Sequence, residues 1–597
     1  MKKFCSMFRM SVLLTIVLVV TICSISVFAA KEVANSTNSK ITIDGVEVKF
    51  DAYVINGNNY FKLRDIAYCL KDTQKRFSVN WVAESNSANL ITGESYIPVG
   101  GEMKLGNNAQ KTATLSDTNI MINGNAVKAT AYVIDNSNYF KLRDLGTLLN
   151  FGVNWDADTK TVEIISAAIE ITCTEKEKVD LESTQTNNIE VIGRDSVVQQ
   201  FLYKDEGMAY AYENGNNLEI VLPGNKISVE KLYPIFADII SDKDGNIYVI
   251  WGRISEIIDN KIQPAVFVSK YSSAGELILT RGSYDPWEDK MHYVSKQPFY
   301  GANTVSAINN NDLVIFYGKT IHDNDQQYSG VYVVDLNYLS TAVTARTNHE
   351  CNRVLVSDSF GNDIVWHDKL NEFWFVSANQ ASSRGFNISS RRTGTPGYAA
   401  STKFFDFYLQ PAANNNKDII NQTFAQMGGA VYTDNGLVFC GASAKSIGED
   451  AKKEGQNLFI QLFDVDWNGK FTYAEGETRQ GLTDVRFYDE NPKMESVTNN
   501  GIIWLTDYAK ESVVRPQIVK ADDKIVILWS KYDPADTSCK KAFCMVLSAD
   551  GKILVPETEL DCRMNSYEKP IYHNGVVSWV YCDDSGSRLH RVNMQVK

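Results

Sequence analysis

The chain has 597 residues, a formal net charge of −13 and 44% hydrophobic residues, so it is long enough for several domains and apolar enough to bury large cores. The acidic balance argues against nucleic acid or anionic lipid as the main partner, because both require a basic footprint. Proline is sparse, at 13 residues, and Asn-Gly and Asp-Gly pairs recur, which is typical of many short strands joined by tight turns.

Residues 1–29 have the pattern of a secretory signal peptide. Three cations precede the apolar run 11–20, and Val27 and Ala29 stand at the −3 and −1 positions of a small-residue cleavage site. The pattern predicts a secreted or cell-surface protein, cleaved after Ala29. An uncleaved anchor is the alternative, but the apolar run is short for a bilayer span of about 20 residues. We therefore expect no stable membrane insertion after cleavage.

An internal duplication follows a predicted linker at 30–40. The heptapeptide NYFKLRD occurs at 59–65 and again at 138–144, each time after AYVI and before VNW. Three matched blocks in the same order indicate a tandem repeat. We assign the first copy, with its joining segment, to residues 41–103 and the second to residues 104–166.

Each copy predicts a small α+β unit with the order ββαββ, because the apolar period changes from two to 3.6 within the motif. Leu63, Ile66, Ala67 and Leu70 fall on one face of a short helix. The apolar members of the motif are predicted to be core: Tyr60, Phe61, Leu63, Tyr139, Phe140 and Leu142. Two interpretations stay open for the charged members, a contact patch for a partner or local bonds that hold the strand-to-helix corner: Lys62, Arg64, Asp65, Lys141, Arg143 and Asp144.

With the joining segment SYIPVGGEM at 95–103, the two copies resemble the copper amine oxidase N-terminal-like domain, also called the stalk domain. That domain occurs in tandem at the front of exported proteins of Gram-positive bacteria. The resemblance implies a non-catalytic extracellular module. It does not imply the catalytic domain of those oxidases, because all six histidines lie outside the repeats and the repeats cannot supply the usual imidazole ligands of copper.

The pattern of apolar and turn residues in the sequence changes after a second predicted linker at 167–190. Residues 191–597 carry short apolar strands that follow turn signals at regular intervals, such as KDGNIYVIW at 243–251 and DDKIVILWS at 522–530. Repeated strand pairs of this kind predict a β-propeller of about seven blades, in a chain that is mostly β. Stacked β-sandwiches are the alternative.

Chemistry-bearing motifs are scarce. The sequence contains no metalloprotease, nucleophile-elbow, phosphate-loop or dinucleotide motif, and carboxylates such as Asp363 and Asp368 are predicted to lie in loops. We therefore predict no catalytic residues and no enzyme. A propeller-type polysaccharide hydrolase or lyase, sialidase-like or otherwise active on glycans, is the alternative. The predicted ligand contacts are a loop tryptophan and the arginines of a long polar loop at 382–398: Trp287, Arg384, Arg391 and Arg392.

The segment DVDWNGKFTYAE at 464–475 fits the template of a calcium-binding loop. Its oxygen ligands would be Asp464, Asp466, Asn468, the carbonyl of Lys470, and Glu475. The flanking sequence is typical of strands, so any calcium would be structural. An ordinary hairpin turn without metal is the alternative, and no other cofactor is required.

Eight cysteines remain after the predicted cleavage, and four of them cluster at 539, 544, 562 and 582. Two interpretations stay open for this cluster: one or two disulfides within it, or buried free thiols.

The tryptophans at strand ends, such as Trp251 and Trp529, fit packing between blades better than sugar stacking. Taken together, the sequence predicts stalk-type repeats that present a propeller to a cell-envelope glycan or a protein partner.

Overall fold

The computed structural model forms two compact units. Unit 1 comprises residues 31–155 and 159–166, and unit 2 comprises 156 and the residues beyond 166. The structure describes residues 31–156, 159–166, 169, 171–181, 198–259, 261–282, 295–300, 303–309, 312–321, 327–336, 350–351, 359–379, 385–391, 401–406, 423–446, 449–465, 471–473, 501–534, 541–565, 568–583 and 587–596. Within these residues, no helix has the length and apolar character that a membrane crossing requires.

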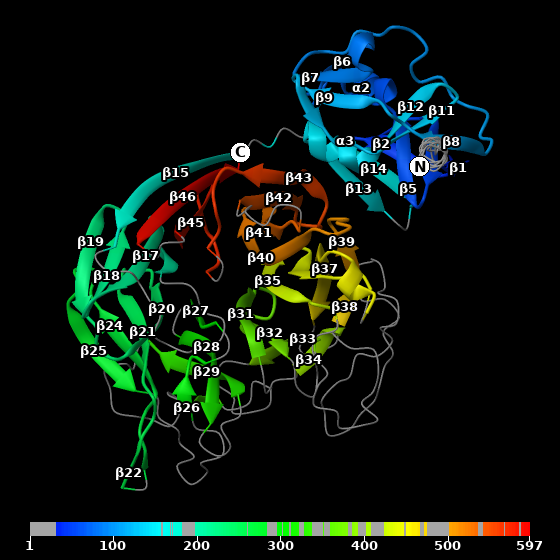
Figure 1. Ribbon diagram of the computed structural model, residues 1–597. Coiled ribbons are helices and arrows are strands. Elements are labelled where there is room, and N and C mark those ends of the chain that lie inside the picture. The colour runs from blue at the N-terminus through cyan, green and yellow to red at the C-terminus, as the bar shows by residue number, and fades with distance from the viewer. Residues whose placement is uncertain are drawn as a thin grey trace, which may run out of the picture. The chain divides into compact units, whose positions relative to one another are not determined.

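Both copies of the repeat contain the predicted order of strands and helix (Figure 1). The elements of the first copy are β1 (Lys31–Ser36), β2 (Lys40–Ile43), β3 (Val46–Glu47), β4 (Ala52–Ile55), β5 (Asn58–Lys62), α2 (Leu63–Leu70), β6 (Phe77–Val82), the short 3-10 helix η1 (Ala83–Ser85) and β7 (Ser87–Thr92). Those of the second are β8 (Lys111–Leu115), β9 (Asn119–Ile122), β10 (Asn125–Val127), β11 (Ala131–Ile134), β12 (Ser137–Lys141), α3 (Leu142–Leu149), β13 (Gly152–Asp156) and β14 (Thr161–Ile165).

The two copies are not separate bodies, because their strands interleave. A closed six-stranded barrel, in the order β1-β4-β5-β12-β11-β8, takes three strands from each copy. The motif strands β5 and β12 pair antiparallel with Phe61 opposite Phe140, the same motif residue of each copy. Two further sheets, β10-β9-β7-β6 and β13-β14-β2-β3, also mix the copies. Unit 1 therefore has an approximate two-fold symmetry centred on the paired heptapeptides.

Alternation along the motif strand divides unit 1 into two cores. Phe61 and the helix residues Leu63 and Ile66 belong to a large apolar cluster between the barrel and the helices. The neighbouring residue Tyr60 points to the opposite face of the strand. That face lines the barrel interior, where four tyrosines pack with small residues of both copies: Tyr53, Tyr60, Tyr132, Tyr139, Ala34 and Ala113.

Unit 2 contains seven sheets of four or five strands in its described part. Blade 1 is β16 (Val198–Tyr203), β17 (Gly207–Asn214), β18 (Asn217–Leu222) and β19 (Asn225–Glu230). Blade 2 is β20 (Ile235–Ser241), β21 (Ile247–Gly252), β24 (Val266–Tyr271) and β25 (Leu277–Gly282), with a hairpin of β22 (Ile257–Ile258) and β23 (Lys261–Ile262). Blade 3 is β26 (Ser295–Pro298), β27 (Val305–Ile308), β28 (Asp312–Ile321), β29 (Gln327–Asp335) and β30 (Glu350–Cys351).

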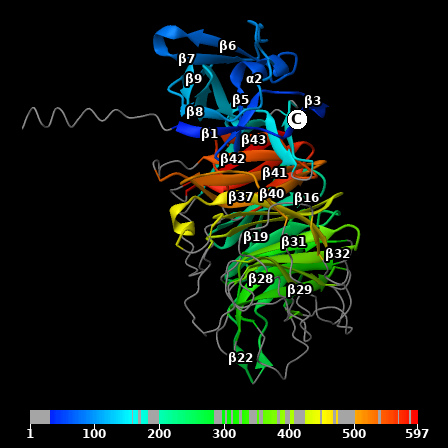
Figure 2. The ribbon, with the colours of Figure 1, turned by 90° about the vertical axis from the view of Figure 1, so that its right-hand side faces the viewer.

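The other four blades follow in chain order (Figures 1 and 2). Blade 4 is β31 (Ser359–His367), β32 (Glu372–Asn379), β33 (Gly385–Arg391) and β34 (Ser401–Asp406). Blade 5 is β35 (Gln426–Thr433), β36 (Gly436–Ser443), β37 (Asn457–Val465), β38 (Phe471–Tyr473) and β39 (Ile502–Trp504), with the 3-10 helix η3 (Ala451–Lys453) between β36 and β37. Blade 6 is β40 (Ser512–Ala521), β41 (Lys524–Tyr532), β42 (Ala542–Ser548) and β43 (Ile553–Leu560). Blade 7 is β44 (Ile571–His573), β45 (Val576–Cys582), β46 (Arg588–Val596) and β15 (Ile171–Asp180).

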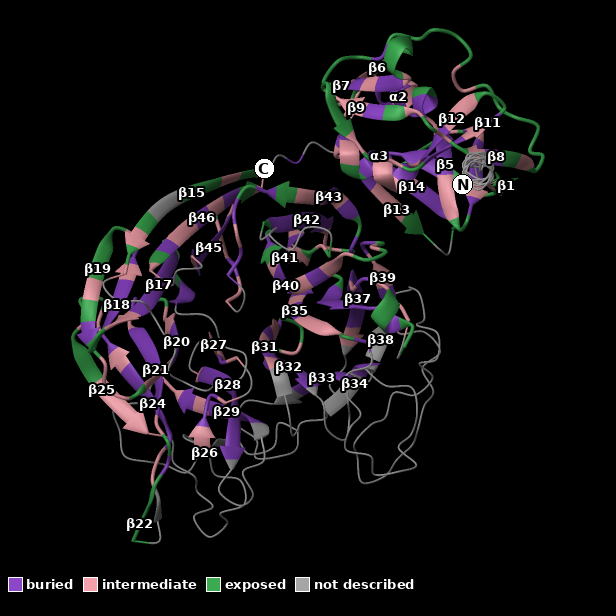
Figure 3. Ribbon diagram, in the orientation of Figure 1, coloured by how far each residue is buried: buried purple, intermediate pink, exposed green. Residues whose placement is uncertain are grey.

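Apolar clusters lie between consecutive blades, and one joins blade 7 to blade 1 through Val580, Leu589, Tyr210 and Tyr212. Central strands such as β21 are buried along their whole length (Figure 3). In blade 2, the first strand β20 lies toward the middle of unit 2 and the last strand β25 lies at its rim, and β31 and β34 of blade 4 are arranged in the same way (Figure 1). The prediction of a mostly β chain with a seven-bladed propeller is thus confirmed, and the alternative of stacked sandwiches is not.

Two segments predicted as linkers contain strands instead. Residues 31–36 form β1 of the barrel, where Ala34 is fully buried among the tyrosines. Residues 171–180 form β15, which pairs with β46 along its length. The sequence of β15 is polar because this strand is the outer edge of blade 7, and exposed edges commonly carry charged side chains. The propeller therefore begins before residue 191.

Candidate functional site

The residues predicted to contact a ligand fall mostly outside the described residues. Trp287, Arg384 and Arg392 are among those not described, and Arg391 is described only by its place as the last residue of β33. The prediction of one long loop at 382–398 was wrong for residues 385–391. These residues pair with β32 as a strand, because Phe386 and Ile388 alternate with polar residues and fill the core of blade 4.

Of the five predicted calcium ligands, the structure describes Asp464, at the end of β37. Asp466, Asn468, Lys470 and Glu475 lie outside the described residues. Strands β37 and β38 form the expected hairpin, with Val465 opposite Phe471. The Asp464 carboxylate already binds the ammonium of Lys369 at 2.9 Å, and the buried ring of His367 lies 3.4 Å away. Among the described residues, no cluster of three potential metal ligands occurs.

We therefore expect calcium to leave the melting temperature of the wild-type chain unchanged, because Lys369 already neutralises Asp464. Burial lowers the pKa of His367 despite the nearby Asp464, so the ring stays neutral and Lys369 is the partner that a metal must displace. Calorimetry in millimolar calcium and in chelator tests this. Stabilisation by calcium that Asp466→Ala abolishes would contradict the expectation and assign the loop to calcium.

In unit 1, two of the charged motif residues, Asp65 and Asp144, bond to nearby backbone. The buried carboxylate of Asp65 accepts the N–H of Met103 at 3.0 Å, and the half-buried carboxylate of Asp144 accepts the N–H of Thr130 at 3.0 Å. Burial raises the pKa of Asp65, which is the sign of a carboxylate kept for structure at some cost in desolvation. Of the first copy's charged residues, Arg64 is exposed.

The two copies differ at one polar contact inside the barrel. Asp51 Oδ2 accepts hydrogen bonds from Lys62 Nζ at 2.8 Å and from the Tyr139 hydroxyl at 2.7 Å. Burial alone would raise the pKa of Asp51, but these bonds outweigh it and hold the pKa below its ordinary value. The equivalent position in the second copy is Thr130, so Tyr60, the counterpart of Tyr139, meets no matching carboxylate.

This asymmetry gives a matched pair of variants. We expect Tyr139→Phe to lower the free energy of unfolding of unit 1 by about 2 kcal/mol, because it removes a hydrogen bond to a charged group. Tyr60→Phe should cost less than about 1 kcal/mol. Asp51 has a lower pKa in the folded state, so its stabilisation is present above the unfolded pKa and is lost as the pH falls through the folded pKa. Denaturation of both variants from about pH 3 to pH 7 measures this, and equal costs for the two would contradict it.

Each copy also exposes one tryptophan. Trp81 on β6 and Trp155 on β13 come from the repeated VNW block, and each is 48% exposed. Large aromatic side chains are usually buried in part or whole, whereas this exposure is kept at the same position twice. The sequence identified the VNW block as a strand but gave no sign that its tryptophans face solvent. By contrast, Trp251 and Trp529 are fully buried between blades.

In unit 2, an ion pair lies at the middle of the propeller. Lys569, in the connection from blade 6 to blade 7, donates from its ammonium to Asp363 Oδ2 on β31 and, at 3.4 Å, to the carbonyl of Ala430 on β35. The Lys569 carbonyl accepts from Gln200 Nε2 of blade 1 at 2.6 Å. A residue that contacts blades 1, 4 and 5 lies near the axis around which the blades are arranged.

The Asp363 carboxylate is only 1% exposed and is fully engaged. Oδ2 also accepts the N–H of Ala430 at 2.7 Å, and Oδ1 accepts the N–H of Ile364 at 2.8 Å. Gly429 permits this approach, because it stands at a β-bulge with a φ of +101° and a Cβ there would lie 2.6 Å from Asp363 Oδ2. The expectation of a loop at Asp363 was wrong. Asp368, however, follows β31 in a turn and is exposed.

Hydrogen bonds that involve side chains join the blades at every junction between consecutive blades. The donors and acceptors, from the junction of blades 1 and 2 to that of blades 7 and 1, are Ser241 Oγ to Leu202 O (3.0 Å), Ser306 Oγ to Asp238 Oδ2 (2.7 Å), Asn362 N to Asn303 Oδ1 (2.7 Å), Ala430 N to Asp363 Oδ2 (2.7 Å), Arg515 N to Gln426 Oε1 (2.8 Å), Gln517 Nε2 to Asn565 O (2.8 Å) and Val580 N to Gln200 Oε1 (2.8 Å). Four side-chain amides, two serine hydroxyls and two carboxylates thus serve to hold the blades together.

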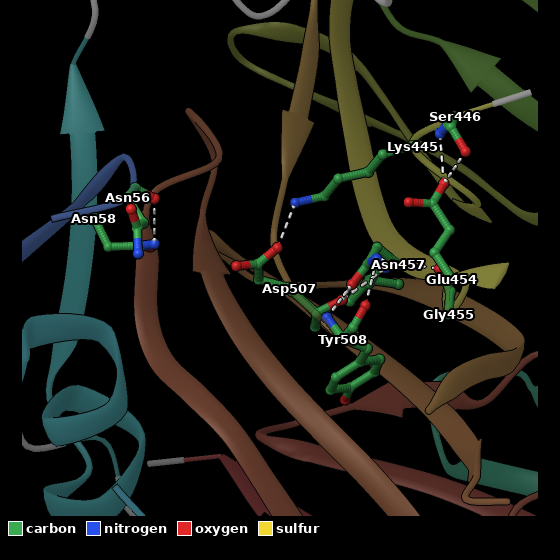
Figure 4. A network of polar contacts seen from close by, with 11 residues as sticks. Asn56, Asn58, Lys445, Ser446, Glu454, Gly455, Asn457, Asp507 and Tyr508 are labelled. Atoms are coloured by element: carbon green, nitrogen blue, oxygen red, sulfur yellow. Dashed lines mark hydrogen bonds and ion pairs between the residues drawn. The ribbon is translucent and has the colours of Figure 1, made fainter. Parts of the chain in front are cut away.

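A second buried polar cluster fixes the connection between β39 and β40. Asn457 on β37 accepts the N–H of Tyr508 at 2.5 Å and donates to the carbonyl of Gly455 at 3.2 Å (Figure 4). The Tyr508 hydroxyl then donates to Glu557 at 2.6 Å, and Lys531 binds the other oxygen of that carboxylate at 2.8 Å. Burial and Glu557 raise the pKa of Tyr508 well above its ordinary value, so this tyrosine acts as a fixed donor.

Comparison with known proteins leaves the family open. No family model matches the chain, and no curated protein matches it. Among solved structures, it is similar to the periplasmic gluconolactonase PpgL of Pseudomonas aeruginosa, at 11% identity over 62% of this chain and 87% of that one, with a TM-score of 0.34. The polysaccharide lyase Uly1 matches at 12% identity over 62% and 91%, with a TM-score of 0.28. The α-L-arabinanase of Cellvibrio cellulosa, solved with arabinohexaose, matches at 9% identity over 56% and 99%, with a TM-score of 0.28. Likenesses this weak carry no argument about what the chain does.

Proposed function

We propose that this chain is an exported, non-catalytic binding protein of the cell envelope or the extracellular space, in which a two-repeat unit accompanies a seven-bladed propeller. The leader pattern of residues 1–29 and the stalk-domain resemblance of residues 41–166 support its location. Its partner is a cell-envelope glycan or protein.

The observation that carries the proposal is the use made of the polar residues on the inner strands of the propeller. A glycan hydrolase needs two carboxylates free to act on one bond. Here Asp363 has its oxygens occupied by Lys569 and two backbone N–H groups, and Asp238 accepts from Ser306 at 2.7 Å. Both are employed in joining blades, which favours a binding module over a hydrolase.

The exposed tryptophans of unit 1 supply a binding surface of the kind that sugars recognise, since an aromatic ring face is a large, rigid apolar contact. Trp81 and Trp155 are the contacts that we propose for a glycan. Because the repeat places one on each of two sheets, each provides its own contact, and two weak contacts on one chain strengthen binding to a polymer.

The test is a binding screen of the chain from residue 31 onward against purified peptidoglycan and envelope polysaccharides, run with assays for release of reducing ends and unsaturated sugars. We expect retention on a glycan without turnover, and loss of that retention in Trp81→Ala/Trp155→Ala. Trp504→Ala, which removes a tryptophan packed on Phe459 in blade 5, is the control for an unspecific effect. Turnover of any polysaccharide would overturn the non-catalytic assignment in favour of a hydrolase or lyase.

A further inference from the structure

Two cysteines far apart in the sequence meet at the outer part of blade 7. Cys173 lies on β15, and Cys562 follows β43 of blade 6 by two residues. Their Sγ atoms are 3.0 Å apart although 389 positions separate them in the chain. Sulfur atoms at this separation are in direct contact, and they would have to approach by about 1 Å to reach the S–S length of a disulfide bond.

The surroundings of this pair are apolar and fixed. Cys562 is 8% exposed within the cluster that joins blades 6 and 7, and Cys173 packs against the same cluster. The register from Ile171 opposite Val596 to Asp180 opposite Arg588 anchors β15 on β46. The contact with Cys562 lowers the pKa of the Cys173 thiol, which favours the thiolate, the form that attacks a disulfide.

We propose that Cys173 and Cys562 form a disulfide bond that ties the first strand of unit 2 to the connection between its last two blades. The oxidant is a small-molecule or protein disulfide. The Cys173 thiolate attacks one sulfur of the oxidant and releases the other as a thiol. Cys562, after losing its proton, then attacks the Cys173 sulfur of the mixed disulfide and releases the second thiol. Two protons and two electrons thus pass from the cysteines to the oxidant.

The bond has a mechanical consequence for the propeller. Blade 7 takes β44 to β46 from the end of the chain and β15 from the beginning of unit 2, so its integrity depends on β15 staying paired. A cross-link across nearly the whole unit restricts the unfolded chain strongly, because the loop that it closes is long. Export, as proposed above, would place the pair where disulfides persist, although the geometry of the pair does not depend on that location.

Neighbouring cysteines supply controls. Cys544 lies on β42 and is fully buried in the same cluster, so it is the competing partner for Cys562. Cys582, at the end of β45, is partly buried. The disulfides that the sequence left open were within the cluster at 539–582, whereas the structure brings one member of that cluster, Cys562, into contact with Cys173.

The experiment treats the chain from residue 31 onward with oxidised glutathione, alkylates the remaining thiols in denaturant, and maps the peptides without reduction. We expect a linked pair of peptides that contains Cys173 and Cys562 and separates on reduction. Reductant should lower the melting temperature of the propeller by roughly 4–8 °C. Cys173→Ala and Cys562→Ala should both remove the linked pair and the sensitivity to reductant, and Cys544→Ala should keep both.

Two results would overturn the proposal. One is full alkylation of Cys173 and Cys562 after oxidation. The other is a linked peptide that joins Cys562 to Cys544 and survives in Cys173→Ala. Because the peptide map reads the bond directly, it stays informative even where a variant melts at a lower temperature for reasons of packing.

Discussion

Separating the two repeats should leave neither able to fold. Residues 31–103 contain the first copy, but the barrel strands β4 and β5 and the strands β6 and β7 end in pairings with the second copy, at β12 and β9. The apolar cluster of unit 1 likewise draws on both helices. Alone, the first copy would leave unpaired the edges of β1, β5, β7 and β2, which pair with β8, β12, β9 and β14 of the second. A domain of this size is already marginal, because it buries only about 60% of the surface that its unfolded chain exposes.

The measurement is circular dichroism and thermal unfolding of three fragments. We expect 31–166 to unfold cooperatively, and 31–103 and 104–166 to show no cooperative transition alone. Mixing the two halves should restore the transition of 31–166, because the cut after Met103 falls in a connection without strands. Cooperative unfolding of 31–103 by itself would show that a copy can pair its own strands, and that the interleaving is not required.

The interleaving could not have been predicted from the sequence. Alternation and the change of period identified the strands and helices of each copy, and the turn residues Asn56, Gly57 and Asp135 adopt the positive φ that such turns need. Which copy a strand pairs with is a different matter. The two copies carry nearly the same strands, so pairing within a copy and pairing between copies satisfy the same pattern of buried and exposed residues.

The ion pair at the centre of the propeller could not be predicted from the sequence for a related reason. Turn signals and apolar strands were enough to indicate about seven blades. Asp363, however, is a polar residue within a strand, and a polar residue reads as a loop unless its partner is known. That partner, Lys569, lies 206 positions later. A side chain at Gly429 would collide with both Asp363 and Lys569. The role of this glycine depends on a β-bulge and on a φ of +101°, and the sequence predicts neither the bulge nor the φ.

The ion pair of Asp363 and Lys569 should be the most sensitive polar contact of unit 2. Lys569→Met keeps the length of the side chain but removes the charge that faces a carboxylate only 1% exposed. An unpaired buried charge costs about 3–5 kcal/mol, so we expect the free energy of unfolding of the propeller to fall by that amount. Asp363→Asn should cost less, because the Lys569 side chain is 34% exposed and water can solvate its ammonium.

A surface pair of the same type supplies the control. Lys541 binds Glu559 at 2.7 Å, with the two side chains 48% and 50% exposed, and Lys541→Met should cost no more than about 1 kcal/mol. Urea denaturation followed by tryptophan fluorescence reports on unit 2, since Trp251, Trp529 and Trp579 are buried between its blades. The double variant Asp363→Asn/Lys569→Met should lower the free energy of unfolding by less than the sum of the two single changes. Each substitution removes the charge that the other substitution alone would leave unpaired. Equal costs for Lys569→Met and Lys541→Met would mean that the central lysine is solvated like a surface residue. The apolar clusters and the hydrogen bonds of the side-chain amides would then hold the blades together without the ion pair.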